Sequence, residues 1–248
     1  MGRSYIVVRW FFLGTLIISL FSGCALWDRY FSSEDDKTPA ELMSDGMEQF
    51  EKGYFEEAAE TFQDLKDRYP YSKFAVQAEL KMADALYERE LYEEAFDAYH
   101  DFEGLHPKNT VIPYVIYRQG MCHFKKITTI DRTQTHASKA KEEFERLVRR
   151  FPSSEYADRV RMKIRECYIK LAEYELYVGN FYFKMGKYRA AMARYRYLIE
   201  HYPDLGQYHE ALESLRKCRE MMPEAQEEQV SEKGQPPSWW YRLTHFFE

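Results

Sequence analysis

Few residues of this chain have the type and spacing that catalysis requires. Paired acids, such as Glu56 with Glu57 and Glu142 with Glu143, fit solvated helix faces better than acid–base pairs. The chain contains no zinc-protease, dinucleotide-binding, phosphate-loop or serine-hydrolase motif. The histidines are scattered and form no cluster with cysteine: His100, His106, His123, His136, His201, His209 and His245. We therefore predict a protein that is not an enzyme and holds neither a cofactor nor a metal ion.

One cysteine, Cys24, stands where its thiol can be acylated. Arg3 and Arg9 form a basic start, residues 10–21 are apolar or small, and small residues directly precede Cys24. This order resembles the bacterial lipoprotein signal, although Phe21 stands where leucine is usual. The resemblance implies cleavage before Cys24 and lipidation of that residue, a stable form of anchoring. Ala25, in place of aspartate, favours the outer membrane, and an uncleaved membrane anchor is the alternative.

The other three cysteines, Cys122, Cys167 and Cys218, lie far apart in helical patterns. No two of them form a Cys-x-x-Cys pair, so a structural zinc site has no support in the sequence. In an oxidising compartment at most two can pair. We expect all three to be small buried core residues without a functional disulfide.

Composition favours a helical fold and restricts the choice of partner. Of 248 residues, 45% are hydrophobic and 17% aromatic, whereas glycine (11) and proline (9) are few. The formal net charge is −6, and since the first 24 residues contain two arginines and no acid, the remainder carries −8. An acidic body argues against nucleic acid as a partner. It also argues against a broad electrostatic hold on an anionic membrane.

Four sets of small, aromatic and proline residues recur at the spacing of tetratricopeptide repeats. With Pro39 in the first place, Gly46 is eighth, Ala58 twentieth, Phe62 twenty-fourth and Pro70 thirty-second. Later units repeat the small, aromatic and proline places as Ala83, Ala95, Tyr99 and Pro107; as Gly120, Ala140, Phe144 and Pro152; and as Gly179, Ala191, Tyr195 and Pro203. We predict an all-α fold, a right-handed α-solenoid of about five tetratricopeptide-type helix pairs.

Signals between the repeats predict the organisation of the chain. Thr38, Pro39 and Glu41 combine an N-cap, a first-turn proline and a capping-box acid, so structure should start there. The third unit contains an insertion at about residues 128–137, and residues 153–187 fit two helices or one long one. A fifth pair should begin at residues 207–221. We expect a signal peptide at residues 1–23 and a lipidated tether at residues 24–37. Repeats one to three should occupy residues 38–152, and repeats four and five residues 153–223. A polar linker with an aromatic-rich tail should follow at residues 224–248.

Units one and three share a tighter signature. Phe62, Leu65, Tyr69, Pro70, Ser72, Phe74 and Ala75 recur at the same spacing as Phe144, Leu147, Phe151, Pro152, Ser154, Tyr156 and Ala157. Behind a lipoprotein signal, this pattern resembles the outer-membrane assembly lipoprotein BamD family over about residues 20–222. The resemblance implies an all-helical, five-repeat, non-enzymatic scaffold on the periplasmic face of the outer membrane. It also implies binding of unfolded outer-membrane proteins, of the barrel-shaped core component of the assembly machinery and of accessory lipoproteins. Another periplasmic repeat lipoprotein, serving pilus, secretin or cell-division assembly, is the alternative.

The sequence suggests two binding surfaces. In such repeats the first helix of each unit lines a concave face, and methionine and aromatic side chains suit many peptides. The expected substrate-peptide groove consists of Met43, Met47, Phe50, Leu80, Tyr87, Tyr114, Tyr117, Met121 and Phe124, flanked by Lys81 and Arg118; core packing is the alternative for these residues. In unit four, Arg189, Arg194 and Arg196 lie among tyrosines, the composition of interface hot spots. The resemblance implies that this end docks on the core component, with Arg194 on the outward face.

Overall fold

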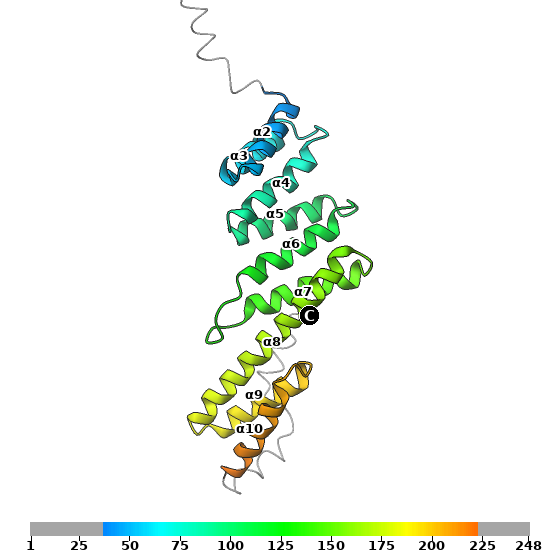
Figure 1. Cartoon of the computed structure of the whole chain (residues 1–248). Helices are drawn as coiled ribbons and strands as arrows, with labels where there is room; N and C mark the ends of the chain where they lie inside the picture. The colour runs from blue at the N-terminus through cyan, green and yellow to red at the C-terminus, as the bar shows by residue number, and fades with distance from the viewer. Residues whose placement is uncertain (1–36, 223–248) are drawn as a thin grey trace, which may run out of the picture. The chain divides into compact units, whose positions relative to one another are not determined.

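The computed structural model describes residues 37–222, and within that range the chain is helical, with nine helices and no strand (Figure 1). It divides into two compact units, residues 1–90 and 91–248. The boundary falls after Glu90, inside the predicted group of repeats one to three. None of the helices in this range combines the length and the apolar composition that crossing a membrane requires. The signal, Cys24, the tether and the aromatic tail lie outside the described residues.

The first unit contains three helices: α2 (Pro39–Glu51), α3 (Phe55–Arg68) and α4 (Ala75–Glu88). The predicted start is confirmed, because the Thr38 hydroxyl accepts from the Glu41 amide and the Thr38 amide donates to the Glu41 carboxylate at 2.8 Å. The two bonds satisfy amide groups that the first turn leaves open. Alanines and large apolar residues alternate in its core, where Phe62 and Leu65 are fully buried.

The second unit contains six described helices: α5 (Tyr92–Leu105), α6 (Ile112–Lys125), α7 (Thr135–Arg150), α8 (Glu155–Lys184), α9 (Tyr188–His201) and α10 (Tyr208–Glu220). The stretch 153–187 therefore contains one long helix, α8, which spans Glu155–Lys184 with 30 residues. The insertion is a loop that ends at Gln134, so residues 135–137 already belong to α7. The predicted fifth pair is represented by α10, and a partner helix for it would lie outside the described residues.

Three glycines show why the repeat spacing is needed. A Cβ added at Gly46, Gly120 or Gly179 would lie 2.6, 2.4 or 2.5 Å from a ring carbon of Phe62, Phe144 or Tyr195. In each case the glycine lies on the first helix of a pair and the ring on the second. The predicted small and aromatic places are therefore one packing contact made three times. This contact confirms the tetratricopeptide-type helix pairs of sequence repeats one, three and four.

The shared Pro-x-Ser turns also have a common structure. The Ser72 hydroxyl accepts from the Phe74 amide at 3.0 Å, and the Ser154 hydroxyl accepts from the Tyr156 amide at 3.2 Å. Each bond holds the turn that starts the next helix, α4 in one case and α8 in the other. The signature that recurs in repeats one and three therefore stabilises the start of the helix that follows each turn.

Candidate binding surfaces

In the first unit, Phe50 lies at the edge of the core beside two other groups. Its ring meets the ring of Phe55 edge to face at 5.2 Å between centroids, and the Lys81 ammonium lies 5.2 Å from its centroid. Lys81 also bonds Asp84 at 2.9 Å, so its charge already has a partner. Met47 and Phe50 are partly buried and pack on the core of this unit. A peptide can contact the rings here, with the lysine at the edge.

In the second unit, α6 and the start of α8 bring aromatic rings together. Tyr114 and Tyr117 lie 5.7 and 5.3 Å from the ring of Tyr156 between centroids. The Arg118 guanidinium lies 5.7 Å from the centroid of Tyr114, and its Nε donates to the Tyr99 hydroxyl at 3.0 Å. Tyr156 is part of this aromatic patch, although the sequence predicted it only as part of a turn signature. The shared Pro-x-Ser-x-aromatic spacing was the signal that could have found it.

The remaining predicted groove residues differ in exposure. Phe124 is partly exposed, with the Lys163 ammonium 4.2 Å from its ring centroid. Met43, Tyr87 and Met121 are buried, at 6%, 7% and 8% exposure, and Leu80 is partly buried. Of the predicted groove residues, Met47, Phe50, Tyr114, Tyr117 and Phe124 are therefore partly exposed, whereas Met43, Tyr87 and Met121 belong to the buried core.

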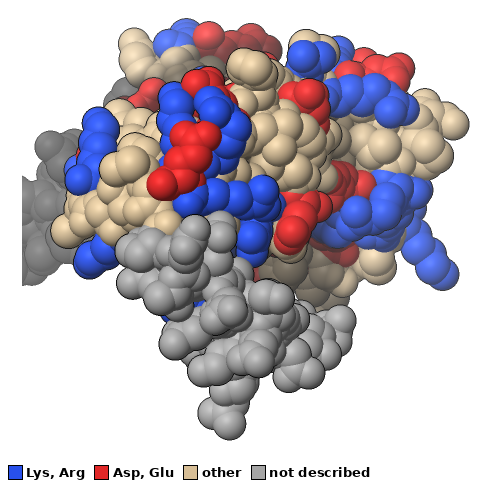
Figure 2. All heavy atoms as spheres, turned by 90° about the horizontal axis from the view of Figure 1, so that it is seen from below, with Lys and Arg blue, Asp and Glu red and all other residues tan. Residues whose placement is uncertain are grey.

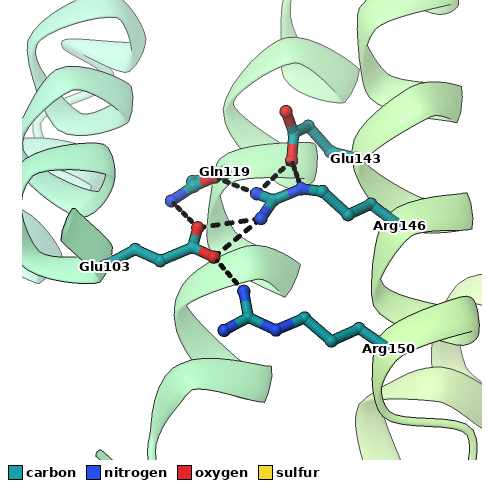
Figure 3. Close-up of polar contacts among 5 residues, drawn as sticks. All are labelled: Glu103, Gln119, Glu143, Arg146 and Arg150. Carbon is teal, nitrogen blue, oxygen red and sulfur yellow. Dashed lines mark hydrogen bonds and ion pairs between the residues drawn. The ribbon is translucent and has the colours of Figure 1, made fainter. Parts of the chain in front are cut away.

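A polar network that sequence analysis did not identify ties α5, α6 and α7 together (Figure 3). The Arg146 guanidinium donates to both carboxylate oxygens of Glu103 at 2.7 and 3.0 Å, to Gln119 at 2.7 Å and to Glu143 at 2.6 Å. Arg150 adds a third arginine bond to Glu103 at 2.6 Å. Burial raises the pKa of Glu103, but the hydrogen bonds and charges of its partners outweigh burial and hold that pKa below its usual range. In the sequence these residues look like ordinary charged positions on helix surfaces. Only the tertiary structure, which brings them together from three helices, distinguishes them from other surface charges.

The three arginines of the predicted docking cluster are not alike. Arg189 and Arg196 are exposed on α9, whereas Arg194 donates to Glu175 of α8 at 3.0 Å. Glu175 is buried, and burial raises its pKa, which the charge of Arg194 partly opposes. On the face drawn in Figure 2, charges of both signs are mixed and separated by uncharged side chains. The cluster is therefore two exposed arginines beside one that is held within the unit.

The three cysteines of the described range and one of its histidines, His123, are packed against other side chains. Cys122, Cys167 and Cys218 are free and buried, and burial raises the pKa of Cys122 and of Cys167 to about 12. His123 lies against the Phe96 ring, 4.6 Å away between centroids, and burial lowers its pKa to about 4. Within residues 37–222, no group of three or more such side chains has the geometry of a metal site.

Comparison with known proteins gives consistent matches. A family model described as outer membrane lipoprotein, YfiO, matches residues 35–233. Outer membrane protein assembly factor BamD of Caulobacter vibrioides is 29% identical over 184 residues, 74% of this chain and 59% of that protein. BamD of Rickettsia prowazekii is 32% identical over 145 residues, 58% of each chain. BamD of Vibrio cholerae is 27% identical over 184 residues, 69% of this chain and 74% of that protein. The chain thus spans less than two thirds of the length of the first two relatives.

Proposed function

Because this chain belongs to the BamD family of outer membrane lipoproteins, we propose that it assembles outer-membrane proteins as a binding scaffold, anchored by lipid to the periplasmic face of the outer membrane. The observation that carries the proposal is the family match, which covers every described helix. Binding, rather than catalysis, fits surfaces that consist of aromatic rings and paired charges. A cross-linking pull-down from intact envelopes tests the role: the barrel-shaped core component and accessory lipoproteins should be recovered with this chain. Recovery of pilus, secretin or division proteins instead would favour the alternative class of repeat lipoprotein.

The substrate side of the proposal rests on the aromatic patches of the two units. We assign binding of an extended, unfolded outer-membrane protein segment to Met47 and Phe50 in the first unit and to Tyr114, Tyr117 and Phe124 in the second. Flat rings and a thioether accept many apolar side chains, and tyrosine hydroxyls add hydrogen bonds. Lys81 and Arg118 lie over these rings. Because Asp84 already pairs with Lys81, we assign attraction of the carboxylate of a peptide end to Arg118.

Phe50→Ala and Tyr117→Ala test this assignment with a fluorescent peptide that ends in phenylalanine. Each should weaken binding by about 1–2 kcal/mol, because a partly buried ring loses its contact area. Tyr71→Ala is the matched control, since Tyr71 is a fully exposed aromatic residue in the turn between α3 and α4 and belongs to neither patch. The assignment is wrong if both patch variants bind as the parent does while circular dichroism shows an intact fold.

For docking on the core component we propose the exposed part of the arginine cluster on α9. Arg189 and Arg196 can offer their donors to a polar or acidic partner, and Arg194 beside them is positioned by Glu175. Arg194→Glu is a poor test, because it would place a second carboxylate beside the buried Glu175. The double variant Arg189→Glu with Arg196→Glu avoids that fault.

This double variant should lose co-purification of the core component and keep peptide affinity within about twofold, since reversed charges repel an acidic partner. Arg161→Glu serves as control, because Arg161 is an exposed arginine on α8 outside the cluster. Normal co-purification of the double variant would remove α9 from the docking surface. If Arg161→Glu also lost co-purification of the core component, the loss would be explained by the change in net charge and not by a docking surface on α9.

A further inference from the structure

The length of α8 leaves one of its faces uncovered. At 30 residues it is about twice as long as α7, with 16, and α9, with 14. Its first half belongs with α6 and α7, and its second half packs on α9, where the Tyr195 ring lies against Gly179 (Figure 1). A helix that continues past its neighbours in this way can be packed on one side only along its second half.

Two large apolar side chains on that second half, Tyr177 and Phe181, are followed by a third at the C-cap, Met185, and we call the three the α8 stripe. They are 43%, 52% and 53% exposed. Residues four apart fall on one helix face, so the stripe runs over two turns, about 12 Å. Core residues Leu176 and Gly179 lie elsewhere on the helix, buried against α9. Single exposed apolar residues are ordinary, but three in line on one helix mark an interaction surface.

The described chain ends in the same unit as this stripe. Met222, its last residue, is 8% exposed and belongs to the buried cluster that α8, α9 and α10 form together. Asn180, on the same half of α8 as the stripe, donates to Glu210 near the start of α10 at 3.2 Å and accepts from the Tyr195 hydroxyl of α9 at 2.7 Å. Residues 223–237 follow, a stretch that spans up to about 50 Å when extended. The segment after it therefore starts within reach of the whole stripe.

The composition of that segment complements the stripe. In a helix, Trp239, Leu243, Phe246 and Phe247 would share one face about 12 Å long, the length of the stripe. Pro237 and Ser238 precede them as helix-start residues. The charges that match belong to the stretch before the segment: residues 223–237 contain four glutamates and one lysine, and Lys184 and Lys187 are exposed at the end of α8. The apolar length of the segment thus matches the stripe, and the acids that precede it can pair with these lysines.

We propose that residues 238–247 dock as a short helix on the α8 stripe of the same chain. The C-terminal segment of the same chain would then cover the α8 stripe. The docked segment adds a further layer beside α8, as terminal repeats cover the end of a stack of helix pairs. The proposal is independent of the substrate and partner assignments above.

Disulfide trapping in the full-length lipoprotein tests the proposal. One cysteine is placed at Thr244, beside the apolar face of the tail, and the other at Lys184, beside the stripe. The control pair joins Thr244→Cys with Met162→Cys, since Met162 is 63% exposed on the other half of α8. The native helical cysteines are buried and stay.

The Lys184→Cys pair should form an intramolecular disulfide at least about tenfold faster than the control pair, because docking raises the local concentration of the tail. A long tether with no docking site would reach both positions alike, so equal rates would overturn the proposal. Faster reaction with Leu212→Cys on α10 or with Met221→Cys at its C-cap, both exposed apolar positions, would place the tail elsewhere. Cross-linked dimers would point to a second copy and would also overturn it.

A second variant separates docking from chance proximity. Tyr177→Ser with Phe181→Ser should lower trapping at Lys184→Cys to the control rate, whereas Tyr71→Ser should leave it unchanged. Both variants alter exposed residues, and circular dichroism should report an unchanged helical fold. Unchanged trapping in the double variant would show that the stripe does not hold the tail. Loss of trapping on addition of phosphatidylglycerol vesicles would show that the tail prefers lipid, and would refute docking as its resting state.

Discussion

At the scale of single residues, size decides where the two helices of a pair can meet. Gly46, Gly120 and Gly179 each lie against ring carbons of an aromatic side chain. A methyl group in that place would overlap ring carbons by about an ångström relative to ordinary contact, and the ring is fully buried in all three pairs. What these three positions require is therefore the lack of a side chain.

Gly120→Ala should lower the free energy of unfolding by about 1–3 kcal/mol, because the new methyl group would lie 2.4 Å from Phe144 Cε1. Gly104→Ala, in the same unit and also within a helix, meets nothing within 4 Å and should raise it by about 0.5–1 kcal/mol. Urea denaturation of the two variants measures both values. Equal effects of the two substitutions would contradict the packing argument.

His123 should make stability depend on pH. Burial first, then the charges of Lys139 and His136, lower its pKa to about 4, below the ordinary value of 6.5. The unfolded chain therefore binds the proton more readily, so the stabilisation is fully present above about pH 6.5 and is lost as pH falls toward 4. The loss should be on the order of 1–2 kcal/mol for a partly exposed ring.

His123→Phe should flatten this part of the pH profile, since a phenyl ring keeps the contact with Phe96 and does not titrate. Denaturant midpoints between pH 4 and pH 7 measure it. His209→Phe is the control, because His209 is exposed on α10. A parent-like profile in His123→Phe would assign the pH dependence to other groups.

At the scale of helices, polar side chains fix how α5, α6 and α7 pack. Glu103, Gln119 and Arg146 come from three helices, and each satisfies the others at distances of 2.7 to 3.2 Å (Figure 3). Because Gln119 is fully buried, its amide needs these partners. The network therefore sets the register of the three helices in addition to apolar packing.

Arg146→Met should destabilise the protein by about 2–3 kcal/mol, because it leaves a largely buried Glu103 and a buried Gln119 short of donors. Arg149→Met on the same helix should change stability by less than about 0.5 kcal/mol, since that arginine is 70% exposed and lies 3.8 Å from Glu145. Thermal denaturation of the pair gives the comparison. Similar losses in both variants would mean that the network adds nothing to surface ion pairs.

At the scale of the whole molecule, we propose separate tasks for the helical units and for Cys24. The proposed binding surfaces lie on the described helices, none of which is long and apolar enough to cross a membrane. The proposed membrane attachment is lipidation of Cys24, which rests on the signal-like sequence before it and lies outside the described residues. The two proposals concern different residues, so separate substitutions can test them.

Cys24→Ala should abolish fatty-acid labelling and release the protein from the outer-membrane fraction, because the acylated thiol is removed. Cys167→Ala, at a buried cysteine, should keep label and location. Metabolic labelling and membrane fractionation report both. Label retained in Cys24→Ala would contradict the lipoprotein signal.

The sequence alone determined what depends on neighbours along the chain. Thr38, Pro39 and Glu41 predicted the first helix start, and the spacing of glycine, aromatic residue and proline predicted the helix pairs, since capping and helical periodicity are local. The tertiary structure alone decided which face of each helix is covered. It buried Met43 and Met121, paired Arg194 with Glu175, gathered Glu103, Gln119 and Arg146, and left Phe181 exposed. Coverage of a helix face depends on helices far away in sequence, and helical periodicity is the same for a face that packs and a face that binds.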